Sequence, residues 1–117
     1  MRGSGIIAAV ALSVAASAAY GAEDRTGVYA SCLTTHLLQY GRGNAESVET
    51  LLKVARPKCE TEYQALKQEA EGDALVEKYA NGVIVDPMEL LSKKIEKAEG
   101  IAIEALLSAR ASKAERG

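Results

Sequence analysis

The 117-residue sequence has few of the residues from which functional sites are usually built. It contains no Trp and no Phe, so five Tyr are its only large aromatic side chains. Few groups are therefore present for stacking on bases, sugars or flat cofactors. One His and two Cys leave little material for a catalytic centre or a metal site. The net charge of −2 argues against nucleic-acid binding, because that surface needs a basic stripe.

Charge is also missing near the N-terminus. After Arg2, the next charged residue is Glu23. The stretch between them has an apolar centre over residues 6–12 and small residues toward its end, over residues 15–22. A positive start, a short apolar centre and small residues before a cleavage site form the pattern of a secretory signal peptide.

We predict that residues 1–21 are this signal peptide, cleaved after Gly21, and that residues 22–117 form a single helical domain. An uncleaved membrane anchor is the alternative, but the apolar centre is short and rich in alanine for a membrane-spanning helix. No later stretch approaches the length of such a helix. The expected location is periplasmic or extracellular, with no stable membrane insertion after signal cleavage.

The rest of the chain has helical periodicity. Apolar residues recur at steps of three and four, and nothing alternates like a half-buried strand. This pattern predicts an all-α fold, a small up-and-down helical bundle of three to four helices. The expected helices are residues 27–40, 45–70, 73–81 and 87–111.

Turn residues set the boundaries of the first two expected helices. Glycines at 41 and 43 end the first helix, and Asn44 is a favourable N-cap for the second. Pro57 interrupts the second helix, yet the apolar pattern keeps its phase across the proline. We interpret 45–70 as a kinked helix, with a break at Pro57 as the alternative.

Later boundaries are signalled in the same way. Gly72 resets the phase of the apolar pattern. Asn81-Gly82 is a typical pair at a helix C-terminus and ends the expected helix 73–81. Asp86, Pro87 and Glu89 form an N-cap, a first-turn proline and a capping box for the last helix. The apolar run 83–85 is too short for a lone strand, so we expect an extended connector laid across the bundle.

The last expected helix has more apolar surface than one neighbour needs. An alanine-rich seam allows another helix to approach closely. Ile101, Ile103 and Leu107 extend the apolar surface beyond that seam. Either this helix is buried on two sides, or these three residues form a face for a partner.

Cys32 and Cys59 lie in the apolar patterns of the first two expected helices. An exported chain with two cysteines most simply forms a disulfide, which would stabilise the fold by about 3 kcal/mol. Counted from the predicted turn, however, the two positions are offset by roughly 9 Å along the helix axes, too far for a symmetric hairpin. Either the helices are staggered or residues 44–46 belong to the loop. A pair of reduced, buried thiols is the alternative.

The sequence around these cysteines also resembles a known pattern. A helix with Tyr-x-x-Cys, a short loop and a second helix whose apolar pattern leads to another Cys resembles small exported proteobacterial helical proteins of unknown function. The matching positions cover under half of the predicted mature chain; they are Tyr29, Cys32, Val48, Leu51, Leu52, Ala55 and Cys59. The resemblance implies export and a disulfide, and it implies no activity.

Residues around the single histidine include possible metal and haem ligands. Cys32 and His36 are four residues apart on one helix, and Cys59 with Glu62 would complete a tetrahedral zinc set. A disulfide would remove both sulfur ligands, so these four residues are candidates only, and we assign no metal. His36 and Met88 are a haem-ligand pair without a supporting motif, so no cofactor is expected.

Catalysis is not expected from this sequence. A Cys32–His36 dyad would need a free, exposed thiolate, whereas both positions face inward. We predict instead a small exported helical protein that is a non-enzymatic interaction or binding module. Its partner is another protein or a second copy of the chain. The alternatives are a protein like the periplasmic stress chaperones, and a metal- or haem-binding helical bundle.

Overall fold

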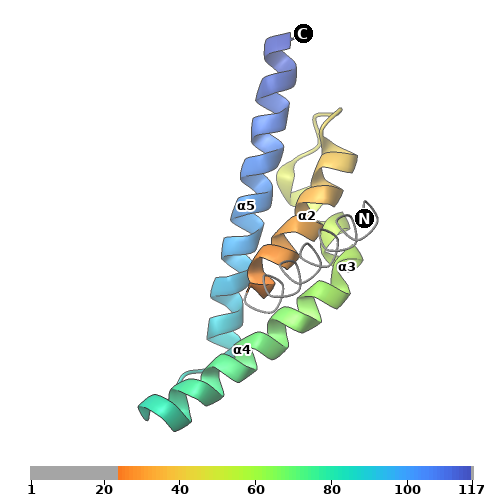
Figure 1. Ribbon diagram of the computed structural model, residues 1–117. Coiled ribbons are helices and arrows are strands. Elements are labelled where there is room, and N and C mark those ends of the chain that lie inside the picture. Colours follow the sequence, from red (N-terminus) through yellow and green to blue (C-terminus); the bar gives the residue numbers. More distant parts are fainter. Residues whose placement is uncertain (1–23, 117) are drawn as a thin grey trace, which may run out of the picture.

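The computed structural model describes residues 24–116, with side chains placed up to residue 113. Within this range the chain forms four helices and no strand (Figure 1), which confirms the predicted all-α fold. The helices are α2 (Arg25–Gly41), α3 (Val48–Lys58), α4 (Glu60–Asn81) and α5 (Pro87–Arg116). The predicted signal peptide, residues 1–21, lies outside the described residues.

In Figure 1, α2 runs upward, α3 and α4 run downward, and α5 runs upward again. In Figure 1, α4 and α5 meet at the lower end of the molecule and diverge from there, and α2 lies between them. α2 packs against each of the other three helices, while α4 packs against α5. The core therefore forms around α2.

Leucine and alanine build this core. The largest fully buried side chains include Leu33 and Leu37 of α2, Leu66 of α4, and Leu91 and Leu106 of α5. Small residues between them let the helix backbones approach closely; they are Ala55, Ala70, Ala98 and Ala102. No polar or charged residue is buried within the part of the chain that the structure describes.

The loop between α2 and α3 is longer than predicted. The second helix begins at Val48 rather than at residue 45, because Ser47 and not Asn44 is its N-cap; the Ser47 hydroxyl accepts a hydrogen bond from the Thr50 amide. Asn44 instead belongs to the loop, where its side-chain oxygen accepts from the Glu46 amide at 3.0 Å.

An arginine from the last helix holds this loop. Arg110 donates to the carbonyl oxygens of Gly41 at 3.0 Å and Glu46 at 2.7 Å. Gly41 is buried, and a Cβ at that position would collide with the Leu51 side chain. The end of α2 can therefore lie close against the start of α3.

The kinked helix predicted over 45–70 is two helices. α3 ends at Lys58 and α4 begins at Glu60, with Cys59 in a turn between them (φ −110°, ψ 30°). Pro57 has no N–H to donate and its ring crowds the preceding turn. The Cys59 amide bonds to the carbonyl of Arg56, three residues back, at 3.1 Å. The alternative prediction, a break at Pro57, is closer to the structure.

The separate helix predicted over 73–81 is the last part of α4. Gly72 is exposed within the helix and does not interrupt it. An internal glycine costs only about 1 kcal/mol, and tertiary contacts hold this region. Ala70 and Ala74 are buried on the same side, and Lys94 of α5 lies 3.0 Å from the Asp73 carboxylate.

The predicted start of the last helix is confirmed, but its end is later. The Asp86 side chain accepts from the Met88 amide at 3.0 Å, and Pro87 is the first helical residue. α4 ends before Gly82, whose φ of 67° is in the left-handed region that favours glycine. α5 continues to Arg116, beyond the predicted residue 111.

Candidate functional site

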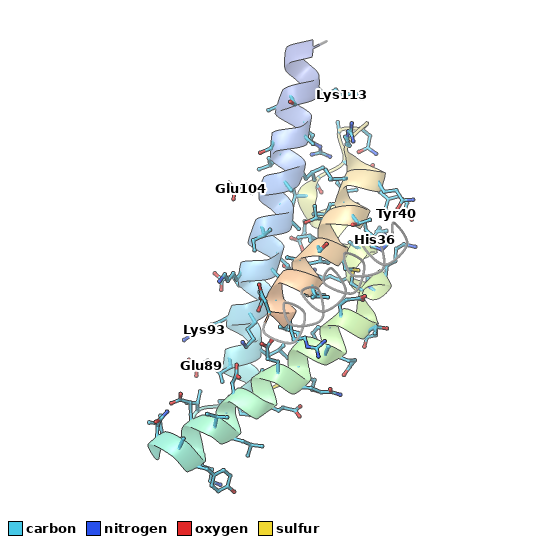
Figure 2. The ribbon with its side chains drawn as sticks, viewed as in Figure 1. His36, Tyr40, Glu89, Lys93, Glu104 and Lys113 are labelled. Carbon is cyan, nitrogen blue, oxygen red and sulfur yellow. A yellow bond between two sulfur atoms is a disulfide. The ribbon has the colours of Figure 1, made fainter. Side chains whose placement is uncertain are left out.

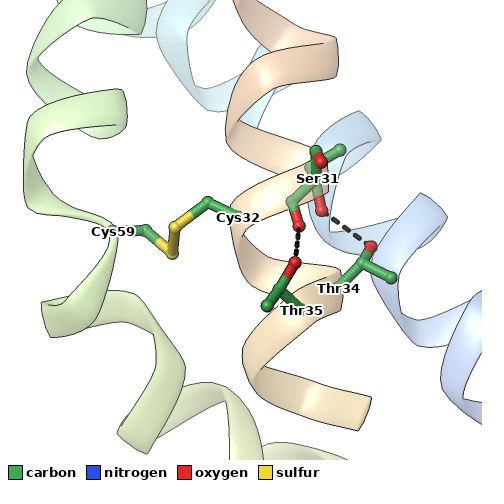
Figure 3. Close-up of a disulfide and its surroundings, with 6 residues drawn as sticks. Ser31, Cys32, Thr34, Thr35 and Cys59 are labelled. Carbon is green, nitrogen blue, oxygen red and sulfur yellow. Dashed lines mark hydrogen bonds between the residues drawn. A yellow bond between two sulfur atoms is a disulfide. The ribbon is translucent and has the colours of Figure 1, made fainter. Parts of the chain in front are cut away.

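The cysteines form the predicted disulfide. Cys32 on α2 is bonded to Cys59 at the joint of α3 and α4, with the two Cα atoms 6.0 Å apart (Figure 3). The loop over 42–47 removes the offset inferred from the sequence. Cys32 lies nine residues before the end of α2 and Cys59 eleven residues after the start of α3, which leaves about 3 Å along the axes.

This bond leaves no free thiol among the described residues for a Cys32–His36 dyad. The neighbouring hydroxyls are also engaged. Thr34 donates to the Ala30 carbonyl at 2.7 Å, and Thr35 donates to the Ser31 carbonyl at 3.0 Å. Figure 3 shows both threonines turned back onto α2. Both threonine hydroxyls are therefore bonded to the backbone of the helix that carries Cys32.

His36 lies beside the disulfide, as its spacing predicted. Ligand atoms of Cys32, His36 and Cys59 all lie within 4.8 Å of one another, but Glu62 does not belong to this group. The His36 ring stacks on Tyr40, with ring centroids 6.2 Å apart, and both side chains project to the same side of α2 (Figure 2). Nδ1 of His36 is buried and has no hydrogen-bond partner among the described residues.

The other haem candidate lies elsewhere. Met88 is exposed in the first turn of α5, at the end of that helix where Figure 2 labels Glu89. His36 lies on α2, toward the other end of the molecule. The fold does not bring this pair together.

A cleft that the sequence did not indicate lies between α2, α3, α4 and α5. It encloses about 540 Å³ and is lined by Tyr29, Arg56, Pro57, Glu60, Tyr63, Ile95 and Glu99. Arg56 donates two hydrogen bonds to the Glu99 carboxylate, at 2.8 and 2.9 Å. The sequence offered no signal for this pair because the two residues are 43 positions apart.

Burial and the groups in this cleft raise the pKa values of two side chains. The hydrogen bond to Glu99 raises the pKa of Arg56, which keeps the guanidinium charged. Burial raises the pKa of the Tyr29 hydroxyl, and the negative charge of Glu99 raises it further. Because the Arg56 guanidinium donates two hydrogen bonds to Glu99, the cleft contains an ion pair that joins α3 to α5.

The partner face predicted on the last helix is only partly exposed. Ile101 and Leu107 are 46% and 51% exposed, whereas Ile103 is half-buried and packs against the core. Six residues separate Ile101 from Leu107, so their side chains point about 120° apart around the helix. They do not form one continuous surface.

A larger apolar surface lies where α4 and α5 meet. Six large apolar side chains are exposed within residues 75–88, and we call them the hairpin-end patch; they are Leu75, Val76, Tyr79, Val83, Ile84 and Met88. The connector is therefore not laid across the bundle, since Ile84 is 79% exposed. Figure 1 shows this end extending beyond α2.

The hairpin-end patch also contains a groove. It encloses about 300 Å³ between the last turns of α4 and the start of α5. Its apolar lining includes Leu75, Ile84 and Val85, and its charged lining residues are Glu71 and Lys78. Neither of these two belongs to an ion pair within the described range.

No helix among the described residues is long and apolar enough to cross a lipid bilayer. α5 is long enough at 30 residues, but charged side chains interrupt it throughout. Comparison of the chain with protein-family models, curated proteins and solved structures finds no match.

Proposed function

We propose that this chain is a small exported helical protein that acts without catalysis, as an interaction module that pairs with a second copy of itself. The observation that carries the proposal is the hairpin-end patch. Its six large apolar side chains are all exposed, from 47% for Val83 to 79% for Ile84. Apolar side chains exposed together at one end of a fold mark interaction surfaces. Ordinary interfaces bury about 800 Å² per partner, so surface around the patch would also take part in a dimer.

Shape supports a second copy as the occupant. A two-fold interface needs a surface that complements itself. The hairpin-end patch has projecting side chains, of which Tyr79 and Ile84 are 77% and 79% exposed. It also has the groove beside Leu75 that would receive such a side chain.

Charge supports the same occupant. Glu71, Leu75 and Lys78 are spaced by four and three residues, so they lie on one side of α4. If two α4 helices cross antiparallel at Leu75, Glu71 of each copy lies next to Lys78 of the other. Glu71 and Lys78 form no ion pair among the described residues. In the dimer they would form two ion pairs, which set the orientation of the two copies.

Export is supported by the N-terminal sequence pattern and by the disulfide. Disulfides persist mainly outside the reducing cytosol. The resemblance to small exported proteobacterial helical proteins is consistent with this location. The bond between Cys32 and Cys59 and the hydrogen-bonded threonine hydroxyls near His36 are consistent with a non-catalytic role.

The oligomeric state of the oxidised protein tests this proposal. We expect sedimentation velocity to show a dimer that dissociates on dilution, and Ile84→Asp to give a monomer with unchanged helical circular dichroism. Ile101→Asp is the matched control, since it places the same charge on an exposed isoleucine outside the patch, and it should leave the dimer intact. A wild-type protein that stays monomeric at high concentration would overturn the proposal.

A charge exchange tests the antiparallel orientation. Glu71→Lys and Lys78→Glu should each weaken the dimer, because each places like charges opposite one another. The double exchange should restore it. If the wild type is monomeric but suppresses the aggregation of an unfolded client, and Ile84→Asp abolishes this, the patch is a chaperone surface instead.

A further inference from the structure

The surroundings of the disulfide contain a donor set that the proposed function does not use. Cys32 and His36 occupy successive turns of α2, and Cys59 approaches them from the joint of α3 and α4. Their two sulfur atoms and a ring nitrogen lie within 4.8 Å of one another. A set of two sulfurs and an imidazole nitrogen binds Zn²⁺ in preference to harder cations.

The histidine in this group is unsatisfied. Nδ1 of His36 is shielded from solvent and has no hydrogen-bond partner in the part of the chain described. Buried polar atoms in folded proteins are nearly always paired, so an unpaired one calls for an explanation. The ring is nearly parallel to that of Tyr40, with centroids 6.2 Å apart, and lies beside the sulfurs.

We propose that opening the Cys32–Cys59 disulfide creates a mononuclear Zn²⁺ site made of Cys32, His36 and Cys59. The reductant is a dithiol. Its thiolate attacks Sγ of Cys32, because Cys32 is half-buried whereas Cys59 is fully buried, and Cys59 leaves as a thiolate. The second thiol of the reductant then releases Cys32 and closes the reductant's own disulfide. Two electrons pass to the protein, and Zn²⁺ replaces the two thiol protons.

The fold can keep these donors together after reduction. α2 packs against α5, α3 and α4 through a core of leucine and alanine side chains, in addition to the covalent link. Tetrahedral Zn²⁺ with Zn–S bonds of about 2.3 Å places its sulfurs about 3.7 Å apart. Cα atoms 6.0 Å apart allow that separation by side-chain rotation.

The site has three protein ligands and an open fourth position. Glu62, the fourth candidate from the sequence, does not lie with the group. Water or a ligand from outside the chain would complete the coordination, as in zinc sites that are not closed. The metal would link α2 to the α3–α4 joint in reducing conditions, where the disulfide cannot.

Co²⁺ and Zn²⁺ binding to the full chain tests this inference. The protein is reduced anaerobically with a phosphine, which becomes a phosphine oxide with oxygen from water while the two thiols take the protons. We expect Co²⁺ to give thiolate charge-transfer bands and strong visible bands of tetrahedral geometry, and Zn²⁺ to bleach them. Native mass spectrometry should find one metal per chain and the loss of two protons. The oxidised protein should bind neither metal.

Variants separate this site from simple dithiol binding. His36→Ala should weaken Zn²⁺ binding by at least about tenfold, and Cys32→Ser should weaken the charge-transfer bands, because only the Cys59 thiolate remains. Glu62→Ala is the matched control and should leave the affinity unchanged. Equal affinity in the parent and in His36→Ala, or no tetrahedral spectrum, would overturn the proposal.

A second measurement tests the case in which reduction unfolds the protein. Helical circular dichroism is followed while Zn²⁺ is added to the reduced chain. If reduction unfolds the protein, Zn²⁺ should restore the helical signal, since binding to an assembled site favours the folded state. A metal-bound chain that remains unfolded would contradict the inference. Neither result depends on dimerisation, so this proposal and the proposed function can fail separately.

Discussion

Apolar side chains are buried along one part of the α4–α5 hairpin and exposed at its end. Where α2 lies over the hairpin, Leu66 and Leu91 are fully buried in the core. At the hairpin end, Leu75 and Ile84 are exposed. α4 is about 33 Å long and α2 about 26 Å, so α2 does not extend over the whole hairpin. The burial of an apolar residue therefore depends on whether a third helix reaches it, and hydrophobicity alone does not decide.

The largest expected effect comes from removing the covalent link on the buried side. Replacing both Cys32 and Cys59 with Ala should lower the free energy of unfolding by about 3.5 kcal/mol, because the unfolded chain is no longer closed into a loop. Alanine avoids burying a serine hydroxyl at position 59. Urea unfolding of the oxidised parent and the double variant measures the difference. An unchanged urea midpoint would mean that the leucine core alone determines stability.

A pair of leucine substitutions makes the comparison direct. Leu66→Ala should cost about 3 kcal/mol, since it leaves a cavity among α2, α4 and α5. Leu75→Ala on the same helix should change monomer stability by less than about 0.5 kcal/mol because Leu75 is exposed. Both are measured under dilute conditions where the chain is monomeric. Equal losses would show that the hairpin end is packed in solution.

The smallest effect concerns pH. The pKa of Tyr29 is raised chiefly by burial and next by Glu99, while Arg56 opposes the shift; Tyr63 and Glu60 add to it. A raised pKa in the folded state means that this stability is fully present below about pH 10 and is lost as the pH rises through the folded-state pKa. Tyr29→Phe should flatten that alkaline loss in thermal unfolding measured across pH.

Tyr79→Phe is the control for this experiment at the hairpin end. Tyr79 is exposed, so the variant should keep the alkaline profile of the parent. An identical profile for parent and Tyr29→Phe would show that burial of the Tyr29 hydroxyl contributes nothing to the alkaline limit of stability.

Local chemistry made much of the fold predictable. Pro87 with the Asp86 cap set the start of α5, and Gly82 set the end of α4, because capping depends on neighbouring residues. The same local reasoning was wrong at Gly72. A glycine lowers helix propensity by about 1 kcal/mol, and contacts between α4 and α5 outweigh that preference.

The candidate sites were less predictable. The spacing of Cys32 and His36 placed them on one side of a helix, and two cysteines allow one pairing within the chain. The Arg56–Glu99 pair had no such signal, since helix packing alone brings α3 and α5 together. The hairpin-end patch was not predicted as one surface. Its residues were divided between the separate helix over 73–81, the connector over 83–85 and the haem candidate Met88, because periodicity reports which residues share a side and not what covers them.

The sequence by itself determined the all-α class, the caps at Gly82 and Asp86, and that Cys32 can pair within the chain only with Cys59. These depend on period, neighbouring residues and cysteine count. Only the tertiary structure decided that the chain turns at Cys59 and continues through Gly72. It also decided that Nδ1 of His36, beside the sulfurs, has no hydrogen-bond partner among the described residues, and that apolar side chains near Ile84 are exposed. These outcomes depend on the lengths and packing of helices far apart in the chain, and local sequence does not encode those distances.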